Sequence, residues 1–330
     1  YYGSNDEFTL AAIASGAYGS YTQYFIYLHS AFAWILRFFY TLYPAWNWYT
    51  LVMYGLIFVS LSAIGCTWIR RSKRIGGIMA VLLVLASLSP MYVELQYTKT
   101  AALVTAAGYI LVFCSERKKR HLFSGIALLV LGSWIRFQAF GMISIAAFGF
   151  WLGLTVKAWR NRDWKTFFVR DCLPCVSAFV LVFGSIALEN VLVYTPGSAE
   201  AHYKEYDKAR QQLLDYGVPG WDEYQAEYEE LGLTKTDVLN LQSWLIADYD
   251  RYTADTFKAI VAFRQDRPFQ WEYLKDYLVI LSLKPLFILS ALATLLWLIP
   301  LLHIKKKKFR VSLNPDWKMI GRRNWIAVFW

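Results

Sequence analysis

Two adjacent carboxylates, Asp6 and Glu7, stand ahead of a run of long apolar segments. Charged groups at a membrane edge are costly to keep near lipid, so such residues are candidates for function. A carboxylate can accept the proton of a hydroxyl nucleophile. The pair therefore indicates general-base chemistry on a hydroxyl acceptor. The alternative is structural, because Asp6 could be the N-cap of a helix over residues 7–15.

Three cations could complement this pair by holding a phosphate group. Lys99 and Arg136 stand at the ends of separate apolar segments, and Lys284 lies about two turns inside another segment. Lys and Arg both bind phosphate oxygens, and Arg can do so with two parallel N–H donors. Further polar candidates on the same membrane face are Glu94, Gln96 and His29.

Most of these residues also have a simpler structural interpretation. Lys99, Arg136 and Lys284 could each extend from a helix end towards water. Glu94 could be an interfacial surface group, and His29 could be a packed residue of an amphipathic segment. The sequence leaves both interpretations open.

The elements that must position these residues are membrane helices. Of the 330 residues, 57% are hydrophobic, whereas about 45–50% is usual for a soluble domain. Most of the apolar blocks approach the ~17–25 residues that cross a bilayer as a helix. The blocks cover residues 47–67, 75–92, 97–114, 121–135, 138–157, 173–195 and 277–303. We therefore predict an all-α polytopic membrane protein, with further spans before Tyr1 and after Trp330.

Positive charge separates the two membrane faces. Outside residues 196–276 the chain has 25 Lys and Arg, and 21 of them lie in four short connections. These connections are residues 70–74, 117–120, 157–171 and 305–323. The positive-inside rule assigns all four to the cytoplasm, so the basic runs require no nucleic-acid partner. The acidic pair and the long loop then face outward.

This topology divides the chain into four parts. Residues 1–46 form a first outer loop with the acidic motif and a pair of amphipathic juxtamembrane helices. Residues 47–195 form a transmembrane bundle of six spans, and residues 196–276 form a small helical outer domain. Residues 277–330 hold another span, a basic cytoplasmic loop and the start of a further span.

The outer loop 196–276 has nine basic and sixteen acidic residues, which gives a net charge of −7. Its helices are predicted over residues 199–215, 221–231 and 237–248, with another opening at 253–255. Gly232 is expected to end the second helix, and Thr234-Lys235-Thr236-Asp237 is expected to cap the third.

The order of motifs along the N-terminal part carries a family resemblance. Asp6-Glu7-Phe8 leads into Ala11-Ala12-Ile13-Ala14-Ser15-Gly16 and an aromatic segment with Tyr27-Leu28-His29. Leu42-Tyr43-Pro44 follows, and a new span opens at Asn47-Trp48. This order resembles the GT-C superfamily of membrane glycosyltransferases, which use polyprenyl-phosphate sugars.

The resemblance implies a GT-C-like transmembrane bundle and an activity. In that superfamily a long outer loop often follows the seventh span. With one span counted before Tyr1, residues 173–195 are the seventh span and the loop 196–276 takes that place. By resemblance, Asp6 activates the acceptor hydroxyl and Glu7 is its partner. The reaction is then an inverting transfer from a polyprenyl-phosphate-linked sugar to a glycan, lipid or protein acceptor at the outer face of the cell membrane.

The sequence also bears on the cofactor and allows two other functions. The chain has no Gly-rich phosphate loop, which favours a lipid-linked donor over a nucleotide sugar. Two adjacent carboxylates allow a divalent metal without specifying one. One rival is a non-enzymatic lipid-phosphate carrier or flippase, in which Asp6 only caps a helix. The other is an outer-surface binding protein, in which the acidic loop 196–276 binds a basic partner.

Overall fold

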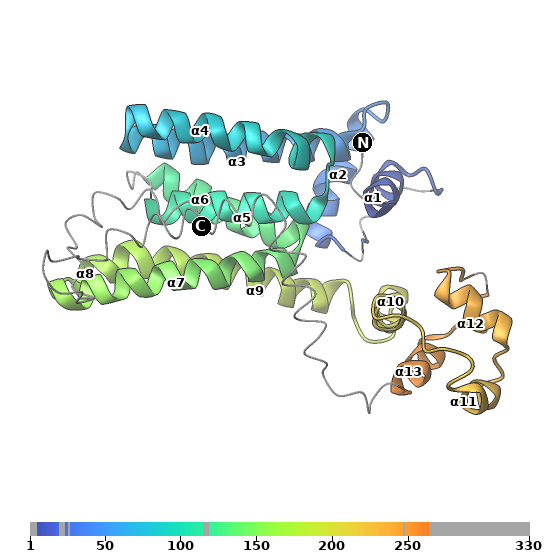
Figure 1. Cartoon of the computed structure of the whole chain (residues 1–330). Coiled ribbons are helices and arrows are strands. Elements are labelled where there is room, and N and C mark those ends of the chain that lie inside the picture. Colours follow the sequence, from blue (N-terminus) through green and yellow to red (C-terminus); the bar gives the residue numbers. More distant parts are fainter. Residues whose placement is uncertain (1–4, 20–23, 26, 115–118, 247, 264–330) are drawn as a thin grey trace, which may run out of the picture. The chain divides into compact units, whose positions relative to one another are not determined.

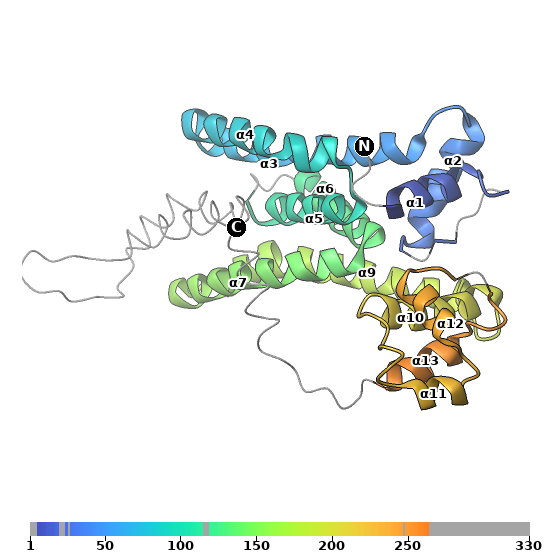
Figure 2. The same ribbon diagram turned by 45° about the vertical axis from the view of Figure 1, so that its right-hand side comes forward.

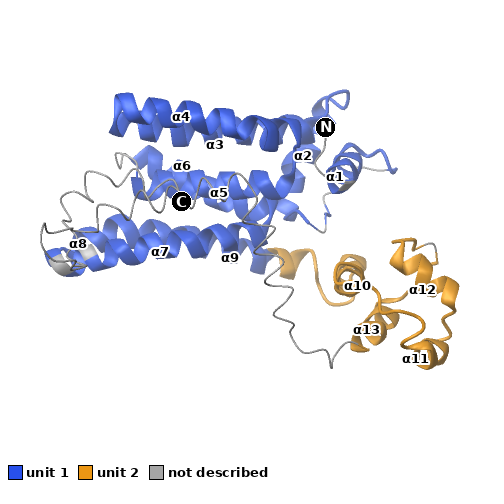
Figure 3. Ribbon diagram, viewed as in Figure 1, with its two compact units in different colours: residues 1–188, 280–330 blue, residues 189–279 orange. Residues whose placement is uncertain are grey.

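The computed structural model describes residues 5–19, 24–25, 27–114, 119–246 and 248–263 (Figure 1). All regular structure in these ranges is helical, and none of the described residues is in a strand. The chain divides into two compact units (Figure 3). Unit 1 is residues 1–188 and 280–330, and unit 2 is residues 189–279.

Five helices of the described part are long and apolar enough to cross a membrane. The first four are α3 (Trp48–Arg71), α4 (Lys73–Ser87) with its π-helical end η1 (Leu88–Val93), α5 (Tyr97–Cys114) and α7 (Phe137–Asn161), whose apolar part ends at Val156. The fifth runs through α8 (Trp164–Phe167), η2 (Phe168–Cys172) and α9 (Leu173–Leu192). This finding confirms the all-α fold with membrane-length helices. The span predicted over 277–303 lies outside the described residues.

The remaining long helix, α6 (Lys119–Ile135), has 17 residues and packs closely on α5. Glycines make this approach possible. A Cβ atom at Gly108 would lie 2.9 Å from the Gly125 carbonyl oxygen, and one at Gly132 would lie 2.2 Å from Thr105 Oγ1. Small residues of this kind let membrane helices come together backbone to backbone.

The helices of unit 1 run back and forth between two ends, as Figures 1 and 2 show for α3, α4, α5 and α6. At one end Arg71 Nε donates to the Cys114 carbonyl (3.1 Å), and Arg70 lies 3.2 Å from His121 Nε2. At the opposite end, α5 begins with Tyr97, whose backbone N–H donates to Glu7 of α1 (Asn5–Ser15). Arg70 and Arg71, of the basic connection 70–74, therefore lie at the end opposite the acidic pair.

Helix α2 (Ser30–Leu42) is amphipathic. Phe32, Leu36 and Tyr40 are buried against unit 1, whereas Trp34 and Phe38 are exposed. Its 13 residues extend ~20 Å, which is too short to span a bilayer. The sequence predicted a pair of amphipathic segments over residues 21–46, and α2 is the one helix among the described residues of that range. Residues 20–23 and 26 lie outside the described part.

The described part of unit 2 has four shorter helices that follow α9 and pack around one apolar core. They are α10 (Ala199–Leu214), α11 (Gln225–Glu230), α12 (Lys235–Gln242) and α13 (Ala254–Ala262). Tyr228, Leu241 and Phe257 are fully buried in the core. The predicted starts of α10 and α13 are confirmed, but α12 ends six residues earlier than expected because the chain turns at Trp244, which has a positive φ of 60°.

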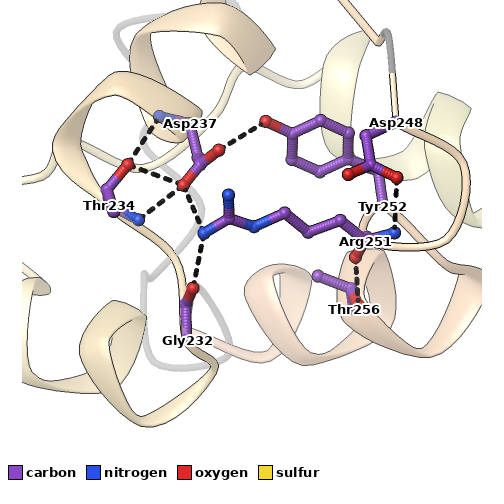
Figure 4. A network of polar contacts seen from close by, with 7 residues as sticks. All are labelled: Gly232, Thr234, Asp237, Asp248, Arg251, Tyr252 and Thr256. Atoms are coloured by element: carbon purple, nitrogen blue, oxygen red, sulfur yellow. Dashed lines mark hydrogen bonds and ion pairs between the residues drawn. The ribbon is translucent and has the colours of Figure 1, made fainter.

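A polar network ties α12 to the segment that follows it (Figure 4). The predicted capping box is present, since Asp237 N–H donates to Thr234 Oγ1 and Thr234 N–H donates to Asp237 Oδ2. Tyr252 donates to Asp237 Oδ1 at 2.9 Å, and Arg251 Nη2 lies 2.8 Å from Asp237 Oδ2. One carboxylate thus joins two segments of unit 2.

Candidate functional site

The acidic pair lies in the first turn of α1, with the two side chains in different environments. Carboxylates at this position interact favourably with the helix dipole. Asp6 is exposed, whereas Glu7 is completely buried. Asn5 is already helical, so Asp6 lies within α1 and is not its N-cap.

Glu7 is bound to the start of α5. Its Oε1 accepts a hydrogen bond from the Tyr97 backbone N–H at 3.0 Å. The first N–H groups of a helix have no partner within the helix, so a buried carboxylate is well suited to satisfy one of them. This contact fixes α1 against α5 and thereby fixes the position of Asp6.

Arg136 lies in the break between α6 and α7, where its backbone is extended (φ −157°, ψ 103°). Its Nη1 donates to the Tyr97 hydroxyl at 2.9 Å. The guanidinium carbon lies 5.5 Å from the Tyr27 ring centre and 5.2 Å from the Tyr97 ring centre. Cation–π contacts to two rings hold the guanidinium in one orientation.

Tyr97 connects the acidic pair to Arg136. Its side chain is buried, its backbone N–H donates to Glu7, and its hydroxyl accepts from Arg136. The structure thus brings together three predicted site residues, Asp6, Glu7 and Arg136, around a tyrosine. Neither Tyr97 nor Tyr27 was among the predicted site residues, because an aromatic residue near a span end is typical of an interfacial anchor.

Lys99 and Glu94 form a separate pair near the start of α5. Lys99 Nζ lies 3.4 Å from Glu94 Oε2, and both side chains are partly exposed. Residues two apart in a helix project to different sides, so Lys99 does not share the face of Tyr97. Gln96 contributes its carbonyl, which accepts from the Thr100 hydroxyl and N–H.

His29 has a structural role at the start of α2. Its Nδ1 accepts from the Ala31 N–H at 3.1 Å, which makes it the N-cap of the helix. Its ring stacks on Trp134 with 5.3 Å between ring centres, and its backbone N–H donates to the Trp134 carbonyl. His29 therefore anchors α2 to α6, as the packed interpretation of this residue anticipated.

The remaining predictions of the site concern Lys284 and a metal. Lys284 lies outside the described residues. Within the described part, no three His, Cys, Asp or Glu side chains are grouped so as to hold a metal ion.

Comparison of the chain with protein-family models, curated proteins and solved structures finds no match. Around Tyr97, the Arg136 guanidinium donates to the hydroxyl at 2.9 Å, and the Glu7 carboxylate accepts from the backbone N–H at 3.0 Å. The exposed Asp6 is the neighbour of Glu7 in α1.

Proposed function

We propose that this chain is a membrane glycosyltransferase of the GT-C type. It would move a sugar from a polyprenyl-phosphate donor to a hydroxyl of a glycan, lipid or protein acceptor. The observation that carries the proposal is that Glu7, the neighbour of Asp6 in α1, and Arg136 both bind Tyr97. A proton acceptor and a phosphate ligand at one end of a membrane bundle are the two groups that this transfer requires.

The proposed step is a single displacement with inversion at the anomeric carbon. The acceptor oxygen attacks this carbon, and the bond between the carbon and the phosphate oxygen breaks. Asp6 takes the proton of the acceptor hydroxyl, and the leaving polyprenyl phosphate keeps the bonding electron pair. Asp6 suits the role of base because its side chain is exposed to an incoming acceptor.

Arg136 is the proposed ligand of the donor phosphate. Negative charge grows on the phosphate as the sugar leaves, and an oriented cation stabilises that charge without reorganising. A guanidinium has five N–H donors, so it can bind Tyr97 and still offer donors to a phosphate oxygen. Tyr27 and Tyr97 supply the orientation through their rings.

Glu7 is proposed to be a positioning residue. Its buried carboxylate binds the Tyr97 backbone and so acts on the site through the placement of α1 and Tyr97. Lys99 and Lys284 remain candidates for the donor phosphate, although Lys99 is paired with Glu94. The positive-inside rule puts this end of the bundle on the extracytoplasmic side of the cell membrane.

The decisive experiment incubates the purified protein in nanodiscs with polyprenyl-phosphate sugars and measures released polyprenyl phosphate. Asp6→Asn should abolish release while the protein keeps its thermal stability. Asp255→Asn is the matched control, because Asp255 also lies in the first turn of a helix, α13, and is 93% exposed. Normal release by Asp6→Asn would refute the role of Asp6. Donor binding without release by the native protein would favour the carrier function instead.

A further inference from the structure

Two successive helices of unit 2 end in the same backbone turn. After α11, Gly232 N–H donates to the Glu229 carbonyl and Leu233 N–H donates to the Tyr228 carbonyl. This pair of bonds is the Schellman motif, in which the first residue after the cap has a positive φ. Gly232 has that conformation, with φ 69°.

The turn after α12 has the same hydrogen bonds but a different residue. Trp244 N–H donates to the Leu241 carbonyl at 3.0 Å, and Leu245 N–H donates to the Asn240 carbonyl at 2.8 Å. Trp244 takes the place of the glycine, with φ 60°. A bulky residue is strained in this conformation, and glycine is the usual choice there.

Packing does not account for the tryptophan. Its side chain is 55% exposed, so the indole gains little from the core of unit 2. Two neighbouring apolar side chains are similarly open, Leu239 at 52% and Leu245 at 60%. The Schellman turn brings the Leu245 backbone N–H to the carbonyl of Asn240, the residue that follows Leu239 in the chain. Leu239, Trp244 and Leu245 are thus three exposed apolar residues at the end of α12, and we call them the α12 tip.

The chain itself indicates what covers this tip. Helix α9 belongs to a candidate membrane span and ends at Leu192, and α10 begins at Ala199. The six residues between them, 193–198, give seven Cα–Cα steps that reach at most ~25 Å, so unit 2 is tethered close to the bilayer. Tryptophan and leucine are the side chains that settle at the headgroup boundary. The net charge of −7 over 196–276 disfavours attraction to anionic headgroups, so apolar insertion is the interaction available.

We infer that the α12 tip, formed by Leu239, Trp244 and Leu245, inserts into the interfacial layer of the membrane. The insertion depth for such side chains is ~5–10 Å. The strained turn presents the indole outward, and a glycine at the same position would leave only the two leucines. The tip is therefore a lipid-binding surface separate from the residues around Tyr97.

The test attaches an environment-sensitive nitrobenzoxadiazole label to Leu245→Cys in a chain whose four native cysteines are replaced. The full chain is reconstituted into phosphatidylcholine vesicles with and without 5-doxyl phosphatidylcholine. Tyr216→Cys carries the same label as a control, because Tyr216 is 81% exposed in the same unit. A second chain adds Trp244→Gly to Leu245→Cys, which keeps the turn and removes the indole.

The proposal expects blue-shifted emission at position 245 and quenching by the doxyl lipid, with neither effect at position 216. Trp244→Gly should reduce the quenching. Equal quenching at both positions, or none at position 245, would overturn the proposal. A blue shift without quenching by the lipid would also overturn it, since that result indicates a protein partner at the tip.

Discussion

The buried carboxylate of Glu7 binds the backbone N–H of Tyr97, a residue 90 positions later in the chain. This hydrogen bond joins the acidic motif to the start of a membrane helix. The Tyr97 hydroxyl in turn accepts from Arg136. Glu7, Tyr97 and Arg136 therefore form one connected chain of contacts that sets where Asp6 lies.

Removal of the Glu7 carboxylate should loosen this connection. Glu7→Ala leaves the Tyr97 N–H buried without its acceptor, and the expected loss is about 1–3 kcal/mol of stability. Glu7→Gln keeps an acceptor oxygen and should lose less. Thermal unfolding in detergent measures both effects. If Glu7→Ala is as stable as the native protein, the contact between Glu7 and Tyr97 does not stabilise the fold.

Donor affinity should depend on Arg136 more than on Lys99. Arg136→Lys keeps the charge but loses the fork and its contact with Tyr97, so the apparent donor KM should rise about 10-fold or more. Tyr97→Phe should have a smaller effect in the same direction. Lys99→Ala is the matched test of the second cation. An unchanged KM in Arg136→Lys would remove Arg136 from the phosphate site.

The close contact between α5 and α6 should not tolerate a methyl group at Gly132. A Cβ atom there would lie 2.2 Å from Thr105 Oγ1, so Gly132→Ala should destabilise the protein by about 1–3 kcal/mol. Gly149→Ala on α7 is the control, because a Cβ atom there meets no atom within 4 Å. Thermal unfolding should separate the two variants, and similar unfolding temperatures would contradict the packing argument.

Acid should weaken unit 2 through Asp237. Burial acts to raise its pKa, but the hydrogen bonds from Thr234 and Tyr252 and the charge of Arg251 together lower the pKa below the usual 3.8. A carboxyl group with a lowered pKa stabilises the fold above its unfolded pKa. This stability is therefore lost as the pH falls below about 4.

Hydrogen exchange of the α12 amides should report this change. Below about pH 4, exchange should be faster than the pH dependence of the exchange chemistry alone predicts. Asp237→Asn should already show faster exchange at pH 7, because it should lower the free energy of opening by about 1–3 kcal/mol. Asp250→Asn is an exposed control that should leave the α12 amides unchanged. Native-like protection in Asp237→Asn would argue against a supporting role of the network.

Substitutions at the positive-φ residue of the two Schellman turns should have opposite effects on the stability of unit 2. Trp244→Gly should stabilise unit 2 by about 1 kcal/mol, because glycine adopts a positive φ without strain. Gly232→Ala should destabilise it by about the same amount, although no atom lies within 4 Å of the added methyl group. Hydrogen exchange measures both. A loss of stability in Trp244→Gly would mean that the indole has a packing role within unit 2.

Local signals in the sequence predicted much of the fold. Apolar length indicated the membrane helices, and the polar break at Arg136 falls between α6 and α7. The Thr234 and Asp237 spacing predicted a capping box that is present. These features depend on residues close together in the chain, so pattern alone reveals them.

Features that depend on distant contacts could not be predicted. Nothing around Glu7 indicates that it binds residue 97, and nothing around Tyr97 indicates that it lies between two charges. The early end of α12 was missed for a local reason, since Trp244 occupies a position where a glycine would have marked the turn. Whether the assembled groups transfer sugars remains a prediction.

The wide spacing of Glu7, Tyr97 and Arg136 also sets an order of assembly during synthesis. Arg136 follows Glu7 by 129 residues. At ~5–20 residues per second, the ribosome needs on the order of ten seconds to make that stretch. Helix α1 leaves the ribosome long before the residues that hold it in place. A nascent chain that stalls before α5 would therefore leave Glu7 without the Tyr97 N–H that it binds in the folded protein.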